Sequence, residues 1–210
     1  MRRLILCIAV LLAAAAALPA ETGSGSPAWL LYERGKTWAS QGEYGKALQH
    51  FKEAILAAGV MPEAEAAIGD IYRAEGEFRL AEQQYSRAYN LKNALVIPET
   101  KYDILYRWAA LYEDQELYSL MESKLLLIVA EDRWNTSEQL PVQVERNFVD
   151  KGLDHVLALY RFDSRFAAAA HSRLGWFYYR TGRYPQSVRH LLYAVVLQVS
   201  EIADFLKQKD

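Results

Sequence analysis

Apolar residues recur at helical spacing from residue 28 almost to the end of the chain. Helical stretches of about 12–15 residues alternate with short breaks, and glycine is common where a helix ends. No run of useful length alternates between apolar and polar residues with a period of two. The pattern therefore predicts an all-α chain of helical hairpins without a sheet. The clearest breaks are residues 41–44, 59–62, 75–78 and 181–184.

Two neighbouring hairpins share a skeleton with a period of 34 residues. Small residues at fixed positions let two helices approach closely, and aromatic residues between them fill the remaining space. A glycine ends the first helix of each hairpin, where a positive φ is often required. The matching pairs are Gly35 and Gly69, Trp38 and Tyr72, Gly42 and Gly76, Tyr44 and Phe78, Ala47 and Ala81, Phe51 and Tyr85, and Ala54 and Ala88.

This skeleton resembles the tetratricopeptide repeat (TPR), which has the same length and the same order of small and aromatic residues. The last hairpin follows it with Gly175, Tyr178, Gly182, Tyr184, Leu191 and Ala194 in phase. A third unit keeps Ala109, Tyr112 and Tyr118, but Met121 and Ile128 replace both small residues of its second helix. Residues 137–166 form a weaker helical pair. The resemblance implies a right-handed α-solenoid of about five antiparallel hairpins.

The first twenty residues have the composition of a secretory signal peptide. Arg2 and Arg3 precede an apolar run that ends in small residues. We expect cleavage after Ala20, with Ala17 as a second possible site, and the alternative is an uncleaved anchor of residues 4–20. The predicted organisation is a signal at 1–20, a linker at 21–27 and a TPR-like domain at 28–207. Cleavage would also remove Cys7, and a cysteine-free exported domain indicates the bacterial periplasm.

Charge and motifs exclude several classes of function. The net charge of −2 and the pI of about 6.1 do not indicate a nucleic-acid-binding protein, which would usually be basic. The four histidines have no second ligand at a spacing typical of a metal site, and no known catalytic or phosphate-binding motif is present. We therefore expect neither an enzyme, nor a cofactor, nor a metal centre.

The first helix of each hairpin carries the candidate binding residues. Repeat positions are counted with Gly35, Gly69, Ala109 and Gly175 at position 8 of their units. In TPR arrays these helices line the concave face, and side chains at repeat positions 2, 5, 9, 12 and 13 point into it. Aromatic and arginine side chains at such positions are frequent anchors of protein recognition. The candidates are Trp29, Tyr32 and Lys36 in the first unit, Asp70 and Arg73 in the second, Tyr106 and Glu113 in the third, and Trp176, Tyr179 and Arg180 in the last.

Each candidate also has a purely structural interpretation. Trp176 can pack on a neighbouring hairpin, Trp29 can seal the end of the array, and the charged candidates can be ordinary solvated residues. Glu82 and Glu122, beside the small positions of the second helices, are expected to be solvated. Some TPR proteins bind carboxylate tails through a Lys, Asn and Arg clamp, and the corresponding positions here (Tyr32, Lys36, Ala66 and Asp70) lack it.

The function that these features predict is a protein-binding scaffold in the bacterial envelope, with another protein or a peptide in the concave groove. Membrane contact is expected only if the signal remains uncleaved. The alternatives are a self-oligomerising structural component, through Met121, Ile128 and residues 125–129 or through the long last helix, and a small-ligand site in the groove.

Overall fold

The computed structural model describes residues 26–132, 140–159 and 166–207, and within these ranges all regular structure is helical. This confirms the predicted all-α fold. The elements are α2 (Ala28–Ser40), α3 (Tyr44–Ala58), α4 (Pro62–Ala74), α5 (Phe78–Asn90), the short 3₁₀ helix η1 (Lys92–Ala94), α6 (Thr100–Asp114), α7 (Tyr118–Glu131), α8 (Leu140–Lys151), α9 (Leu153–Leu159), α10 (Ala167–Arg180) and α11 (Tyr184–Lys207).

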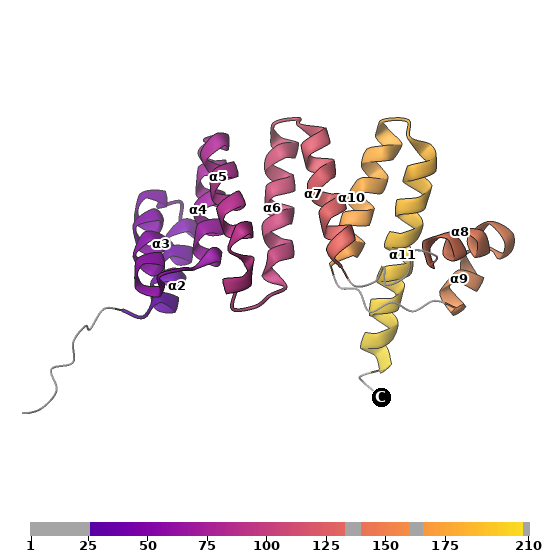
Figure 1. Cartoon of the computed structure of the whole chain (residues 1–210), viewed down its shortest axis with the longest axis horizontal. Coiled ribbons are helices and arrows are strands. Elements are labelled where there is room, and N and C mark those ends of the chain that lie inside the picture. Colours follow the sequence, from indigo (N-terminus) through magenta and orange to yellow (C-terminus); the bar gives the residue numbers. More distant parts are fainter. Residues whose placement is uncertain (1–25, 133–139, 160–165, 208–210) are drawn as a thin grey trace, which may run out of the picture.

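Four antiparallel hairpins stack side by side as layers of a solenoid (Figure 1). Layer 1 is α2/α3, layer 2 is α4/α5, layer 3 is α6/α7 and layer 4 is α10/α11. Each layer contacts its neighbours, and α10 packs directly on α7. A single hairpin cannot bury its apolar face alone, so the core forms where neighbouring hairpins meet.

The small positions lie where helices touch, as the period predicts. Ala47, Ala54, Ala81 and Ala88 of the second helices are fully buried. The glycines of the first helices also mark close contacts. A Cβ at Gly35 would lie 2.5 Å from the Phe51 ring, and one at Gly69 would lie 2.8 Å from the Tyr85 ring. These contacts confirm the repeat register.

The turn inside each layer repeats one backbone conformation. Gly42, Gly76 and Gly182 have φ values of 77°, 78° and 74°. Layer 3 has Glu116 at the same place, with a φ of 57°. A side chain with a Cβ is strained in this left-handed region, so layer 3 keeps the turn at a cost that the glycines avoid.

Replacing that residue should stabilise the protein. We expect Glu116→Gly to raise the free energy of unfolding by about 1 kcal/mol, because it removes the strain of a left-handed non-glycine residue. Urea unfolding followed by circular dichroism measures the change. Gln115→Gly, one residue earlier and at a φ of −95°, is the control and should destabilise. A loss of stability in Glu116→Gly would contradict this explanation of the turn.

The weaker pair predicted within residues 137–166 is present as α8 and α9, but it does not form a layer. Figure 1 shows both helices beside α11, outside the stack. Val144 and Val156 are buried against residues of α10 and α11. The five predicted hairpins thus divide into four stacked layers and one lateral pair.

Polar groups at the N-terminus of α10 connect layers 3 and 4. The Asp132 carboxylate, just after α7, accepts hydrogen bonds from the backbone N–H groups of Phe166 (3.1 Å) and Ala167 (2.6 Å). Such a carboxylate satisfies free N–H groups at a helix start. The ring of Phe166 also stacks on Tyr102 at 4.6 Å between centroids. These contacts fix where α10 begins, although α8 and α9 separate it from α7 along the chain.

Two sequence-based expectations about side chains were wrong. Glu82 and Glu122 are not simply solvated, because they accept hydrogen bonds from the hydroxyl groups of Tyr112 and Tyr178, each at 2.7 Å. Each of these bonds links the second helix of one layer to the first helix of the next. The carboxylates therefore act as polar connectors between layers.

The alternative of an oligomer contact through layer 3 stays a prediction. Met121 and Ile128 are bulkier than the repeat pattern requires, but both are buried in the core of their own chain. Leu125 is buried in the same core. Within residues 125–129, Leu126 is exposed, so an oligomer contact at this helix would use that residue and not the buried ones.

The predicted signal at residues 1–20 and most of the linker lie outside the described residues, so export stays a prediction. Within the described part of the chain, no helix combines the length and apolarity that a membrane crossing needs.

Candidate functional site

An open groove of about 420 Å³ lies between the first helices of layers 1 and 2. It brings together three of the predicted binding residues, Tyr32, Lys36 and Asp70. Aromatic and apolar side chains form most of its remaining surface, and Arg107 of α6 closes one side. The lining residues are Tyr32, Lys36, Ala39, Tyr44, Phe51, Ala67, Asp70, Ile71, Ala74 and Arg107.

The aromatic side of the groove is built on the close packing of layer 1. The ring of Tyr32 lies 5.6 Å from that of Phe51, which packs over Gly35. Burial raises the pKa of the Tyr32 phenol, and nearby Lys36 partly offsets this. Tyr32 therefore stays a neutral hydrogen-bonding group with an apolar ring.

The basic side of the groove is Lys36. Its Nζ lies 5.4 Å from the centre of the Tyr32 ring and 3.0 Å from a carboxylate oxygen of Glu33 on the same helix. Both charged side chains are about half exposed. An exposed pair of this kind is weak, so a ligand carboxylate can compete for the lysine.

The acidic residue of the groove, Asp70, already has hydrogen-bond partners within the chain. The Asp70 carboxylate accepts hydrogen bonds from the Tyr85 hydroxyl (2.7 Å) and from Nη1 of Arg107 (2.5 Å). Burial raises the pKa of the Tyr85 phenol, and the negative charge of Asp70 raises it further. Asp70 thus positions Arg107 beside the groove and joins layer 2 to layer 3.

Further along the stack, the predicted residues Arg73 and Glu113 pair with charged residues of the next first helix. Arg73 of α4 contacts Asp114 of α6 at 2.6 Å, and Glu113 of α6 contacts Arg173 of α10 at 2.6 Å. Together with the Asp70–Arg107 pair, these contacts link three consecutive first helices. They are partly exposed, so each contributes modest stability, but together they fix how neighbouring layers meet.

The remaining candidates lie apart from the groove. The Tyr106 hydroxyl donates to the backbone carbonyl of Phe166, so this residue belongs to the junction of layers 3 and 4. Trp29 is exposed at the start of α2. The structural interpretation of Trp176 as a packed residue is not supported, because 56% of its surface is exposed. Tyr179 and Arg180 are exposed beside it on α10.

Sequence reasoning missed Arg107 and Arg173, which complete the network of ion pairs. Both occupy repeat position 6, on the side of the first helix that faces the preceding layer. Arg107 is opposite in charge to Asp70 at position 9 of the preceding unit, and Arg173 is opposite in charge to Glu113 at position 12. This charge pattern is the sequence signal that could have found them.

A larger hollow of about 580 Å³ lies over α5 and contains none of the predicted residues. Its lining includes Ile55, Val60 and Trp108, together with Glu65 and Arg87, which form an ion pair at 2.9 Å. The groove is the better candidate for a binding site, because the ammonium group of Lys36 is held only by its exposed contact with Glu33.

Two histidines separated in the sequence meet between α10 and α11. Nδ1 of His171 lies 3.0 Å from Nδ1 of His190. Burial lowers the pKa of His171 to about 3, helped by His190, and burial lowers that of His190 to about 4, helped by Arg189. Within the described residues no cluster of three or more His, Cys, Asp or Glu could hold a metal ion.

The chain is similar to an uncharacterized relative and to solved structures of MamA. No family model matches the chain. An uncharacterized protein of Treponema pallidum (strain Nichols) is 26% identical over 175 residues, which is 80% of this chain and 45% of the relative, so the chain spans less than half of that protein. A MamA fragment, "41-end", from Desulfovibrio magneticus RS-1 matches with 17% identity and a TM-score of 0.44, over 85% of this chain and 98% of the fragment. A crystal structure of MamA matches 84% of this chain and 80% of its own, with 15% identity and a TM-score of 0.52, and this likeness supports a TPR-like helical-repeat fold.

Proposed function

We propose that the protein is a non-enzymatic scaffold that binds another protein through the groove between α2 and α4. The observation that carries this proposal is the composition of the groove, where the partly exposed rings of Tyr32 and Tyr44 lie beside Lys36. Protein-binding surfaces are enriched in aromatic anchors, and anchors held on helices lose less conformational freedom on binding than anchors on mobile loops.

The groove favours an extended segment that carries an apolar side chain next to a carboxylate. The partly exposed rings of Tyr32 and Tyr44 offer the apolar contact, and the buried Phe51 lies beneath them. Lys36 offers a cation whose present partner, Glu33, is exposed and easily replaced. Arg107 is paired with Asp70, so it contributes to the shape of the groove more than it offers an unpaired positive charge to a ligand.

The proposed setting is the bacterial envelope. This part of the proposal rests on the signal-like sequence of residues 1–20, in which two arginines precede an apolar run. An exported repeat domain without a recognisable catalytic motif is suited to holding other envelope proteins together.

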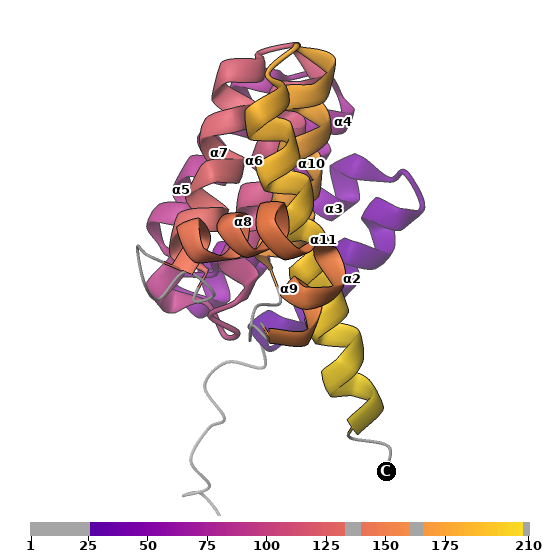
Figure 2. The same ribbon diagram turned by 90° about the vertical axis from the view of Figure 1, so that its right-hand side faces the viewer.

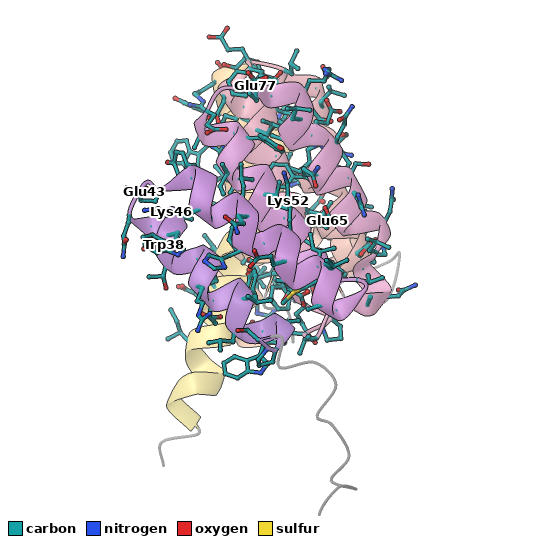
Figure 3. The ribbon with its side chains drawn as sticks, turned by 90° about the vertical axis from the view of Figure 1, so that its left-hand side faces the viewer. Trp38, Glu43, Lys46, Lys52, Glu65 and Glu77 are labelled. Carbon is teal, nitrogen blue, oxygen red and sulfur yellow. The ribbon has the colours of Figure 1, made fainter. Side chains whose placement is uncertain are left out.

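Site-specific cross-linking in the native host tests the proposal. A photoreactive amino acid at Lys36 should give discrete adducts with a partner, because this side chain lines the groove. Lys52 is the matched control: it is exposed on α3, and Figure 3 shows it on the outer side of layer 1. It should give no such adducts. Export predicts that the adducts are recovered from the periplasmic fraction.

Two outcomes of the cross-linking experiment would contradict different parts of the proposal. If position 36 gives no adduct, or the same adducts as position 52, the groove is not the binding site. If the adducts are specific to position 36 but are recovered from the cytoplasm, only the proposed location is wrong.

A further inference from the structure

In the inner layers, repeat positions 12 and 21 contact the next layer. At position 12, Arg73 and Glu113 form ion pairs with the following first helix. At position 21, Glu82 and Glu122 accept hydrogen bonds from tyrosines of that helix. Position 17 of layer 3 does the same, since the Tyr118 ring stacks on Phe177 of α10 at 5.7 Å. We call positions 12, 17 and 21 the forward positions.

In layer 4 the forward positions are exposed and carry no charge. They are Tyr179 (55% exposed), Tyr184 (59%) and Val188 (54%). Trp176, at position 9, adds to the same surface: its ring meets that of Tyr179 edge-on at 5.9 Å, and Tyr179 meets Tyr184 at the same distance. Figure 2 looks onto this end and shows α8 and α9 across the lower part of the hairpin, with the part next to the α10–α11 turn left uncovered. We call these four residues the end patch.

Layer 1 shows what covers such a patch inside the chain. Its forward positions 17 and 21 are Tyr44 and Leu48, the same kinds of residue as in layer 4. Both are partly buried against a core cluster that includes Ile68 and Ile71 of α4. An aromatic and an aliphatic residue at these positions are thus covered by an amphipathic helix with an aliphatic face.

We propose that the end patch binds an amphipathic α-helix of another protein, which lies on layer 4 as α4 lies on layer 1. The bound helix presents aliphatic side chains to Tyr184 and Val188. It also carries a carboxylate near Arg180, which is exposed and has no ion-pair partner among the described residues. This contact is separate from the groove and does not depend on it.

A second copy of the chain does not fit this surface. In head-to-tail assembly α2 would take the place of α4, but Glu33, Arg34 and Thr37 stand where α4 has Ala67, Ile68 and Ile71. These three side chains of α2 are exposed. Figure 3 looks onto this end and shows Trp38, Glu43 and Lys46 gathered near the α2–α3 turn. Tail-to-tail assembly would bring two copies of Arg180 to one patch, and like charges repel.

A synthetic peptide of residues 62–74, held helical by a cross-link on the face opposite Ile68, is the probe. We expect saturable binding to the full chain in the micromolar range, measured by fluorescence anisotropy. Val188→Glu should weaken binding at least about tenfold, because it places a charge against the aliphatic face of the peptide. Leu56→Glu, at an exposed aliphatic residue of α3, is the matched control and should bind as the parent does. Lys36→Glu should also leave peptide binding unchanged, which separates this site from the groove.

Three results would overturn the proposal. The first is the absence of saturable binding up to about 1 mM peptide, which corresponds to only about 4 kcal/mol of binding free energy. The second is equal binding by Val188→Glu and the parent, with both folded by circular dichroism. The third is a dimer of the chain in sedimentation experiments that Val188→Glu converts to a monomer, which would make a second copy the occupant.

Discussion

Ala81→Leu is expected to lower the free energy of unfolding by roughly 1–3 kcal/mol or more. Ala81 is fully buried, on the side of α5 that contacts other helices. The added carbon atoms have no space there, so helices or side chains must shift. Small domains have a total stability of only about 5–15 kcal/mol, so the loss is a large fraction of it. Thermal melts followed by circular dichroism measure the effect.

Gln83→Leu is the matched control for this substitution. Gln83 is exposed on the same helix, and glutamine, alanine and leucine are all good helix formers, so helix propensity does not separate the two variants. We expect a change within about 0.5 kcal/mol. Equal and negligible losses in both variants would contradict the TPR register.

Glu82→Leu, which the repeat pattern alone suggests as a neutral change, is not a suitable control. Its carboxylate accepts the hydrogen bond of the nearly buried Tyr112 hydroxyl. Leaving such a donor without an acceptor costs about 1–3 kcal/mol.

Acid is expected to destabilise the protein through the His171–His190 pair. Both pKa values are lowered in the folded chain, to about 3 and about 4. The unfolded chain therefore takes up protons as the pH falls through about 6.5, whereas the folded chain does not. Stability is complete above that value and is lost as the pH decreases. Between pH 7 and pH 5 the loss is up to about 2 kcal/mol for each histidine.

The charged groups around the pair act in opposite directions and do not reverse this loss. The carboxylates of Glu122 and Glu145 favour the charged form of His190, whereas burial and Arg189 oppose it. His171 is buried beside Tyr193, whose ring it meets edge-on at 5.3 Å. The net effect of these neighbours is a pair that stays neutral in the folded chain.

Urea unfolding at pH 7 and pH 5 measures the acid effect. His171→Gln and His190→Gln should each show a smaller difference between the two pH values than the parent, whatever their stability at pH 7. His50→Gln is the control, because His50 lies on α3 away from the pair, and it should keep the full difference. An undiminished difference in both variants of the pair would show that other groups cause the acid loss.

The stack itself could be predicted from the sequence because its determinants are local and repeated. Gly69, Ala81 and Ala88 recur at the same offsets as Gly35, Ala47 and Ala54. Each position needs a small residue for a steric reason that does not depend on distant parts of the chain. The 34-residue period therefore determined the helical hairpins, their stacking and the buried small positions.

The partners of the polar residues could not be predicted in this way. The repeat pattern predicts a solvated Glu82, because it places this residue outside the hairpin's own core. Tyr112 lies thirty residues further along and reaches Glu82 across the layer contact. Asp70, Arg73 and Glu113 likewise meet their arginine or aspartate partners on the next first helix. A pattern read within one unit does not contain these contacts.

The sequence by itself determined that this chain is a stack of helical hairpins with small residues at the helix contacts, because sterics at those positions act within one repeat. Only the tertiary structure decided that α8 and α9 lie outside the stack and that α10 packs directly on α7. It also decided which aromatic residues line the groove and which remain exposed at the end patch. Those features depend on which surfaces of distant segments meet, and burial between such segments is set by the assembled chain.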